Sequence, residues 1–107
     1  MRFEIILAPG AVAQLRSLPA HVRSKVRDAL DRHLRYEPTQ LSKSRIKRLR
    51  GLARPQYRLR VDDTRVFYDV TQGRVEVLAI VSKADAQSWL EDEGAPSAEG
   101  GAGRGKG

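Results

Sequence analysis

Three stretches of alternating apolar and polar residues, separated by short turns, constrain the fold of this chain most strongly. Residues Tyr57–Val61 read YRLRV, Thr64–Val70 read TRVFYDV, and Arg74–Ser82 read RVEVLAIVS. A period of two residues is typical of a strand with one buried face. The connections, DD and TQG, are short enough for hairpin turns. The pattern therefore predicts three consecutive strands in an antiparallel meander.

The third of these stretches is apolar on both sides in its second half, which predicts an interior position in the sheet. Its alternation places Val75, Val77, Ala79 and Val81 together on one face, and Glu76, Leu78 and Ile80 on the other. An earlier stretch, Arg2–Leu7, alternates more weakly and predicts an opening strand.

Helical periodicity occupies the segment between the opening strand and the meander. Val12, Leu15 and Leu18 recur at three-residue steps after Pro9, which suits the first turn of a short helix. A second helix is expected over residues 20–36, ending before Pro38. Its apolar face carries six residues, Val22, Val26, Ala29, Leu30, His33 and Leu34. The two helices are expected to form a hairpin with a shared apolar face.

The remaining segments are less regular. Residues 40–54 have only Ile46, Leu49 and Leu52 as apolar anchors, so we expect a helical turn or loop there. A closing helix is expected over residues 83–91, with Ser82 as its cap. Trp89 on this helix is expected to pack in the core, with stacking on a nucleic-acid base as the alternative.

Together these elements predict an α+β fold, in the order strand, helix, helix, three strands, helix. The sheet is expected to be mostly antiparallel, with the helical hairpin packed on one face. Residues 1–92 are expected to form the domain, because residues 93–107 are mostly Gly, Ala, Ser and Glu and are expected to form a flexible tail.

Several classes of site and location are disfavoured by composition. The chain has no cysteine, and its two histidines, His21 and His33, lie twelve positions apart, so we expect no metal site. No cofactor motif was found. The N-terminal apolar run of five residues at most is too short for a signal peptide or a membrane span, which favours a cytoplasmic protein without membrane contact.

Positive charge is concentrated in one segment. Residues 43–65 contain nine Lys or Arg and two Asp, so the net charge of this segment equals the +7 of the whole chain. Such a concentration favours a polyanionic partner, most simply RNA. The alternative is a solvated basic face without a partner. The cations expected to grip phosphates without chemistry are Lys43, Arg45, Lys47, Arg48, Arg50 and Arg54.

Three further arginines lie on the predicted hairpin. Alternation places Arg58 and Arg60 on one side of a strand, about 7 Å apart. Arg65 starts the next strand and is expected close to this pair. We expect the three guanidinium groups to lie on one surface and to bind phosphate. The alternative is that nearby carboxylates on the adjacent strands neutralise them.

Two runs of the sequence resemble a known family. The run from Lys47 to Val70, KRLRGLARPQYRLRVDDTRVFYDV, and the run from Val75 to Leu90, VEVLAIVSKADAQSWL, resemble the RelE/ParE superfamily of bacterial type II toxins. The leucine, basic residue and glycine at Leu49–Gly51, followed by Tyr57–Arg60 and Arg65–Tyr68, are the most specific part. The resemblance covers nearly the whole predicted domain and implies a RelE-like fold.

The resemblance also implies a function and partners. RelE-like members cut messenger RNA on the ribosome, whereas ParE-like members inhibit DNA gyrase, and a cognate antitoxin neutralises either kind. In RNA cleavage the 2′-OH attacks the adjacent phosphate, so a protein has to supply proton transfer and positive charge. By motif position, Arg58, Arg60 and Arg65 match the family's basic residues, and we assign catalytic roles to them and to Lys83.

The segment after the last strand departs from the family pattern. RelE-like nucleases bring a further arginine and a tyrosine or histidine from this region, but here an alanine occupies the arginine position and Leu90 the tyrosine position. Lys83 and Asp85 are the only charged residues nearby in the sequence. The sequence is therefore compatible with four functional hypotheses. The protein is a ribosome-dependent endoribonuclease, a non-enzymatic gyrase inhibitor, a toxin relic that only binds RNA, or a generic basic RNA-binding module.

Overall fold

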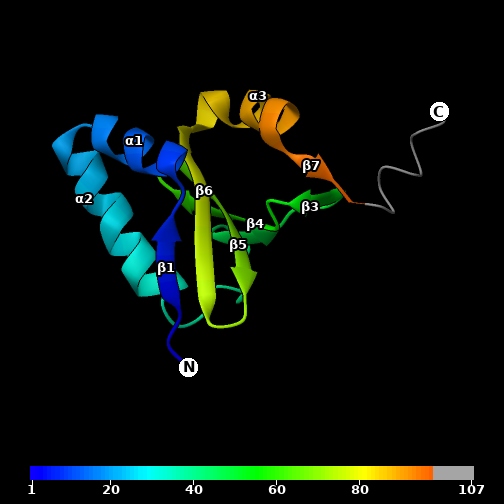
Figure 1. The fold of residues 1–107 in the computed structure, drawn as a ribbon. Helices are drawn as coiled ribbons and strands as arrows, with labels where there is room; N and C mark the ends of the chain where they lie inside the picture. The colour runs from blue at the N-terminus through cyan, green and yellow to red at the C-terminus, as the bar shows by residue number, and fades with distance from the viewer. Residues whose placement is uncertain (98–107) are drawn as a thin grey trace.

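The predicted meander forms the larger part of a five-stranded sheet in the computed structural model, which describes residues 1–97. The sheet order is β1-β6-β5-β4-β2 (Figure 1). The strands of the meander are β4 (Tyr57–Val61), β5 (Thr64–Thr71) and β6 (Arg74–Ser82), and the edges are β1 (Glu4–Leu7) and β2 (Ile46–Arg48). Only β1 pairs in parallel, with β6, so the sheet is mostly antiparallel, as predicted. Strand β6 is interior, as its apolar composition indicated, and β5 is central.

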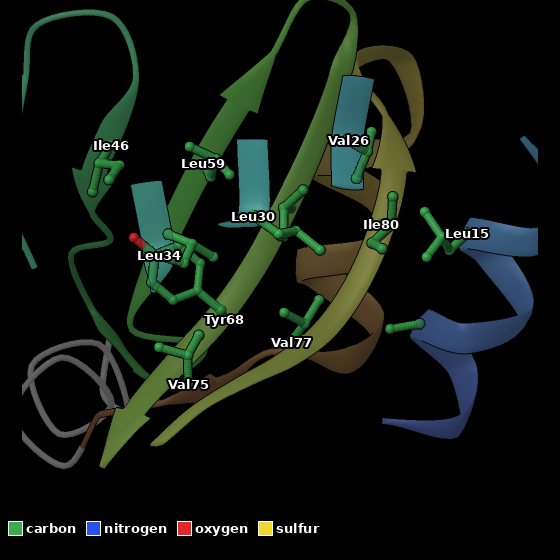
Figure 2. Close-up of a cluster of buried hydrophobic side chains, with 12 residues drawn as sticks. Leu15, Val26, Leu30, Leu34, Ile46, Leu59, Tyr68, Val75, Val77 and Ile80 are labelled. Carbon is green, nitrogen blue, oxygen red and sulfur yellow. The ribbon is translucent and has the colours of Figure 1, made fainter. Parts of the chain in front are cut away.

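The helical hairpin covers one face of this sheet (Figure 1). Helix α1 spans Pro9–Ser17, with its proline in the first turn, and α2 spans Ala20–Ala29. The second helix continues as a π-helical turn over Leu30–Leu34, which the sequence periodicity did not indicate. Buried side chains from the hairpin meet one face of the strands in a single core (Figure 2). The α+β fold predicted from the sequence is confirmed.

A bulge in β6 changes which of its side chains reach this core. Tyr68 pairs with Val77, whereas the preceding Phe67 pairs with Ala79, so Leu78 is the extra residue. A one-residue shift moves all following side chains to the other face. Ile80 therefore joins the core, while Ala79 lies outside it. The expectation that Val75, Val77, Ala79 and Val81 share one face was wrong for this reason.

The cationic segment also differs from its prediction. Residues 40–54 were expected to form a helical turn or loop, but they contain strand β2 and a second short strand, β3 (Leu52–Arg54). Gly51 lies in the turn between them with φ +75°, a conformation that a residue with a Cβ rarely adopts. Of the three expected apolar anchors, Ile46 is fully in the core, opposite Leu59 of β4.

The C-terminal part begins as predicted and then adds a strand. Helix α3 spans Lys83–Glu93, and the Ser82 Oγ accepts a hydrogen bond from the Asp85 N–H at 3.1 Å. After α3, the short strand β7 (Ala95–Pro96) pairs with β3, so the expected tail starts with residues of α3 and a paired strand. The rest of that tail, residues 98–107, lies outside the described residues.

Helix α3 lies on the face of the sheet opposite the helical hairpin. The ring of Trp89 stacks on Phe67 of β5, with centroids 5.2 Å apart and planes within 5°. Phe67 is not part of the core cluster below α1 and α2, and Trp89 is partly exposed. Trp89 therefore packs within the protein. The remainder of this face, hereafter the open face, carries the hairpin arginines.

Candidate nucleic-acid interface

Strand register places the hairpin cations in two neighbouring rows on the open face. Arg58 of β4 lies between Lys47 of β2 and Phe67 of β5 as their Cα partner. Arg60 lies directly opposite Arg65 in the next row. Because residues opposite each other in a sheet share a face, Lys47, Arg58, Arg60 and Arg65 belong to one surface. The sequence-based expectation that the three hairpin arginines lie together is confirmed by this register.

Arg58 is the cation of the group with buried hydrogen-bonding capacity that is not used within the described residues. Its side chain is half-buried, and its Nε is buried without a hydrogen-bond partner within residues 1–97. Burial lowers the pKa of Arg58, and the neighbouring charges of Arg65 and Arg60 lower it further. An arginine nevertheless stays protonated at neutral pH. A desolvated guanidinium with an unused donor is suited to bind an anion.

Arg65 has a different environment from the one predicted. It is only 7% exposed, and its Nη1 donates to the Asp62 carbonyl at 2.7 Å and to the Thr64 carbonyl at 3.1 Å. These bonds tie the guanidinium to the β4–β5 turn, where Asp62 has φ +52°. Arg65 thus fixes the turn and adds positive potential beside Arg58. The expectation of a surface-exposed phosphate ligand did not anticipate this burial.

The cations predicted to grip phosphates do not form one surface. Lys47 lies beside Arg58, while Arg48, next in the chain, lies over the Tyr57 ring at 5.1 Å on the other side of the sheet. Arg54 forms ion pairs with Asp69 at 3.7 Å and Glu76 at 3.4 Å, so its charge is largely neutralised. Lys43, Arg45 and Arg50 are exposed in the segments that flank β2.

Carboxylates occupy the other end of the open face. Asp69 is 7% exposed and accepts a hydrogen bond from the Gln56 N–H at 2.7 Å. Burial raises the pKa of Asp69, while the bond from Gln56 and the charge of Arg54 oppose that shift. Glu76 is the direct Cα partner of Asp69 on β6. The open face is therefore cationic toward β2 and acidic toward the β5–β6 turn, which disfavours a polyanion along its whole length.

Lys83 lies just beyond the end of β6, at the strand end that carries Arg65. It is exposed in the first turn of α3, its N–H donates to the Asp63 carbonyl at 2.7 Å, and it lines a shallow hollow with Asp63, Ser82 and Ala84. That hollow does not include Arg58 or Arg60. The structure therefore brings together three of the four residues to which catalytic roles were assigned, and leaves Lys83 at the margin.

Among the described residues, no tyrosine or histidine lines the hollow beside Lys83 or the hollow beside Arg60. Tyr68 lies on the helix-covered face, where its hydroxyl donates to the Pro38 carbonyl at 2.6 Å. Burial raises the pKa of Tyr68 well above its ordinary value, so this hydroxyl is a poor proton-transfer group at neutral pH.

Two residues of the open face were not found by sequence reasoning. Asp69 was considered only as a partner for the hairpin arginines, and its bonds to Gln56 and Arg54 depend on how β3 meets β5. Alternation places Phe67 on the same side of its strand as Arg65 and Asp69, and Trp89 stacks on it. An apolar residue between two polar neighbours on the open side was the available signal.

Two further findings concern residues 1–97 only. They contain no cluster of three or more His, Asp or Glu side chains arranged to hold a metal ion. None of their helices combines the length and the apolar character needed to cross a membrane.

Sequence comparison decides the family. The model of the ParE toxin, from the type II toxin–antitoxin system parDE, matches residues 5–87, which is most of the chain. The chain belongs to this toxin family. It is therefore the toxin of a type II toxin–antitoxin system. No curated protein sequence matches it significantly.

Solved structures with the same fold are toxins of such systems. The RelE–RelB complex from Pyrococcus horikoshii OT3 is 27% identical, with a TM-score of 0.59, and the match covers 78% of this chain and 97% of that one. A mutant of E. coli toxin RelE in the free state is 20% identical, with a TM-score of 0.64 and coverage of 85% and 94%. The RelB–RelE complex from Methanococcus jannaschii is 18% identical, with a TM-score of 0.62 and coverage of 79% and 98%. The RelE-like fold implied by the sequence resemblance is confirmed.

Proposed function

We propose that this toxin inhibits translation as a ribosome-dependent endoribonuclease that cuts messenger RNA in the cytoplasm. The observation that carries the proposal is Arg58, half-buried between Lys47 and Phe67, with an unpaired Nε and no carboxylate partner within residues 1–97. An RNA phosphate on the exposed part of this side chain would offset the repulsion from Arg60 and Arg65.

The chemistry requires little from the protein beyond charge and positioning. The 2′-OH of one nucleotide loses its proton to a base and attacks the adjacent phosphorus, which forms a cyclic phosphate; the bond from phosphorus to the 5′-oxygen of the next nucleotide breaks, and an acid protonates that oxygen. Negative charge develops on the non-bridging oxygens, where Arg58 and Arg60 would stabilise it. Arg65 would contribute its potential without direct contact, because its Nη1 is bound to two carbonyls. Lys83 is the candidate for proton transfer, assisted by groups of the ribosome or the RNA.

A second function is favoured by two specific observations. The matching family model is that of ParE, and Lys83 lies in a hollow separate from Arg60. Both favour a toxin that binds its target, DNA gyrase, without cutting RNA. In this case the arginine rows would bind an acidic protein surface or DNA.

A cognate antitoxin is the proposed partner under either function. Three of the matching structures are complexes of a RelE toxin with its RelB antitoxin, or of RelBE2. An acidic antitoxin segment that covers Arg58 and Arg60 would offset the charge of the interface and block its target.

Mapping RNA ends after induced expression separates the two functions. Ribosome-dependent cleavage predicts discrete new 5′ ends within translated frames, and Arg58→Ala should abolish them. Arg27→Ala is the matched control, because it removes one exposed arginine from α2 on the far side of the sheet. Intact messenger RNA together with broken DNA would refute the nuclease proposal and support gyrase inhibition.

A further inference from the structure

Beyond the arginine rows, two hollows meet at Arg45 on the β2 edge of the sheet. One is lined by Ser44, Arg45, Arg60 and Asp62. The other, of about 90 Å³, is lined by His33, Glu37, Gln40, Ser42, Arg45 and Ile46. Arg45 lines both, so the two hollows adjoin at its side chain and outline a path from the site outward.

The first hollow has the composition of a phosphate site. Arg60 and Arg45 are held together by the backbone, since the Arg60 N–H donates to the Arg45 carbonyl at 2.8 Å. Both side chains are exposed, and neither forms an ion pair within residues 1–97. The single carboxylate of this hollow, Asp62, is paired with Lys25 at 3.1 Å. An anion at Arg45 and Arg60 would therefore meet two unused guanidinium groups.

The second hollow has a different chemistry. Its imidazole, carboxylate, amide and hydroxyl groups can donate to and accept from the edges of a base and the hydroxyls of a ribose. At about 90 Å³ this hollow is too small to enclose a whole nucleoside, so it would contact only a base edge or the ribose hydroxyls. The carboxylate of Glu37 disfavours a second phosphate there.

The neighbouring surface is also suited to a nucleotide. Tyr36 and Leu41 are 58% and 54% exposed, and they are two of the four exposed large apolar side chains within residues 1–97. Tyr36 directly precedes Glu37 in the chain, and Leu41 directly follows Gln40; both Glu37 and Gln40 line the hollow. An exposed tyrosine beside cations is a common stacking platform for single-stranded nucleic acid.

We propose that RNA bound at Arg58 continues over the β2 edge, with one phosphate on Arg60 and Arg45 and a base edge or ribose hydroxyl of the adjoining nucleoside against His33, Glu37 and Gln40. The inference rests on the proposed RNA-directed function and extends it by a second nucleotide subsite. The acidic end of the open face, at Asp69 and Glu76, excludes the opposite direction. The footprint therefore lies over β4 and β2 rather than along β5 and β6.

His33 reports on the occupancy of this subsite. Burial lowers the pKa of His33, and the charges of Arg45 and Arg32 lower it further, whereas Asp28 raises it. Glu37 is the other charged group in the hollow. A phosphate at Arg45 would offset the charge of that arginine, so the His33 pKa should rise when RNA fills the path. His21, the only other histidine, lines a different hollow with Lys25 and Asp63 and serves as an internal reference.

The test uses the full chain, free of antitoxin, with uridine oligonucleotides whose 2′-O-methyl groups prevent cleavage. A trinucleotide is expected to reach Arg58 alone, and an octanucleotide is expected to span both subsites. Arg45→Ala should weaken the octanucleotide about five-fold, leave the trinucleotide unchanged, and lower the slope of log affinity against log salt by about 0.7. NMR titration should show the His33 pKa rising with the octanucleotide and not with the trinucleotide.

The controls distinguish the failure of this inference from the failure of the proposed function. Arg27→Ala removes one exposed charge elsewhere and should affect both oligonucleotides little. If Arg58→Ala weakens both oligonucleotides but Arg45→Ala affects them equally, or His33 does not respond, the second subsite is wrong and the first stands. If Arg58→Ala affects neither oligonucleotide, the RNA-directed function itself fails, and the second subsite fails with it.

Discussion

The two faces of the sheet differ in what their side chains do, although they alternate along the same strands. On β4, Leu59 is fully buried beneath the helical hairpin (Figure 2), while its neighbours Arg58 and Arg60 point to the open face. The covered face is closed by apolar contacts. The open face holds like charges close together, which disfavours folding in the absence of a partner.

This difference indicates that adjacent residues of one strand serve different purposes, one the stability of the fold and the next the function of the protein. Residues of the covered face should affect unfolding, and exposed cations of the open face should affect toxicity. Arg65 and Asp69 are intermediate, because each is polar, on the open face and buried. The following variants test the separation, beginning with the largest expected change in stability.

Leu59→Ala should lower the free energy of unfolding by about 2–5 kcal/mol, because it removes a fully buried side chain from the centre of the core. Urea denaturation followed by circular dichroism measures the change. A loss below about 1 kcal/mol would mean that the covered face does not depend on this contact.

Arg65→Ala should cost about 1–3 kcal/mol, because the Asp62 and Thr64 carbonyls lose the donor that satisfies them. Arg60→Ala is the matched control, since Arg60 is the direct cross-strand partner of Arg65 but is exposed. That control should change stability by less than about 0.5 kcal/mol. Equal costs for the two variants would contradict the structural role of Arg65.

Asp69→Asn should have a smaller effect that depends on pH. Burial raises the folded-state pKa of Asp69 above its unfolded value, so its protonation favours the folded state. This contribution is fully present below the unfolded pKa and is lost as the pH rises through the folded pKa. Asparagine keeps an oxygen acceptor for the Gln56 N–H but does not titrate.

Relative to the unmodified protein, the Asp69→Asn variant should therefore be more stable at about pH 7 than at about pH 4. Denaturation series at the two pH values measure this difference. A difference with the opposite sign would mean that the charge of Arg54 and the bond from Gln56 outweigh the burial of the carboxylate.

The sequence predicted the elements whose signals are local. Alternation over five or more residues located β4, β5 and β6, and the spacing of apolar residues located α1 and α2. Ser82 marked the start of α3. Strands β2 and β3 were missed because each has only three residues, and their pairing with β4 and β7 is set by tertiary structure.

The candidate site could be predicted in part for the same reason. Alternation correctly placed Arg58 and Arg60 on one surface. The burial of Arg65 depends on carbonyls of the β4–β5 turn, and the neutralisation of Arg54 depends on Asp69 and Glu76 of other strands. The bulge at Leu78 likewise has no local signal, because the residues around it are apolar on both sides.

The most direct test of the separation between the two faces combines toxicity and stability in Arg58→Ala. Growth is followed after induced expression in the absence of antitoxin, and the unfolding free energy is measured on the purified variant. We predict that growth arrest is lost while stability changes by less than about 0.5 kcal/mol, because the substitution removes a half-buried cation of the open face that Arg60 and Arg65 repel and whose Nε has no partner within residues 1–97. Growth arrest that persists in a folded Arg58→Ala variant would contradict the account.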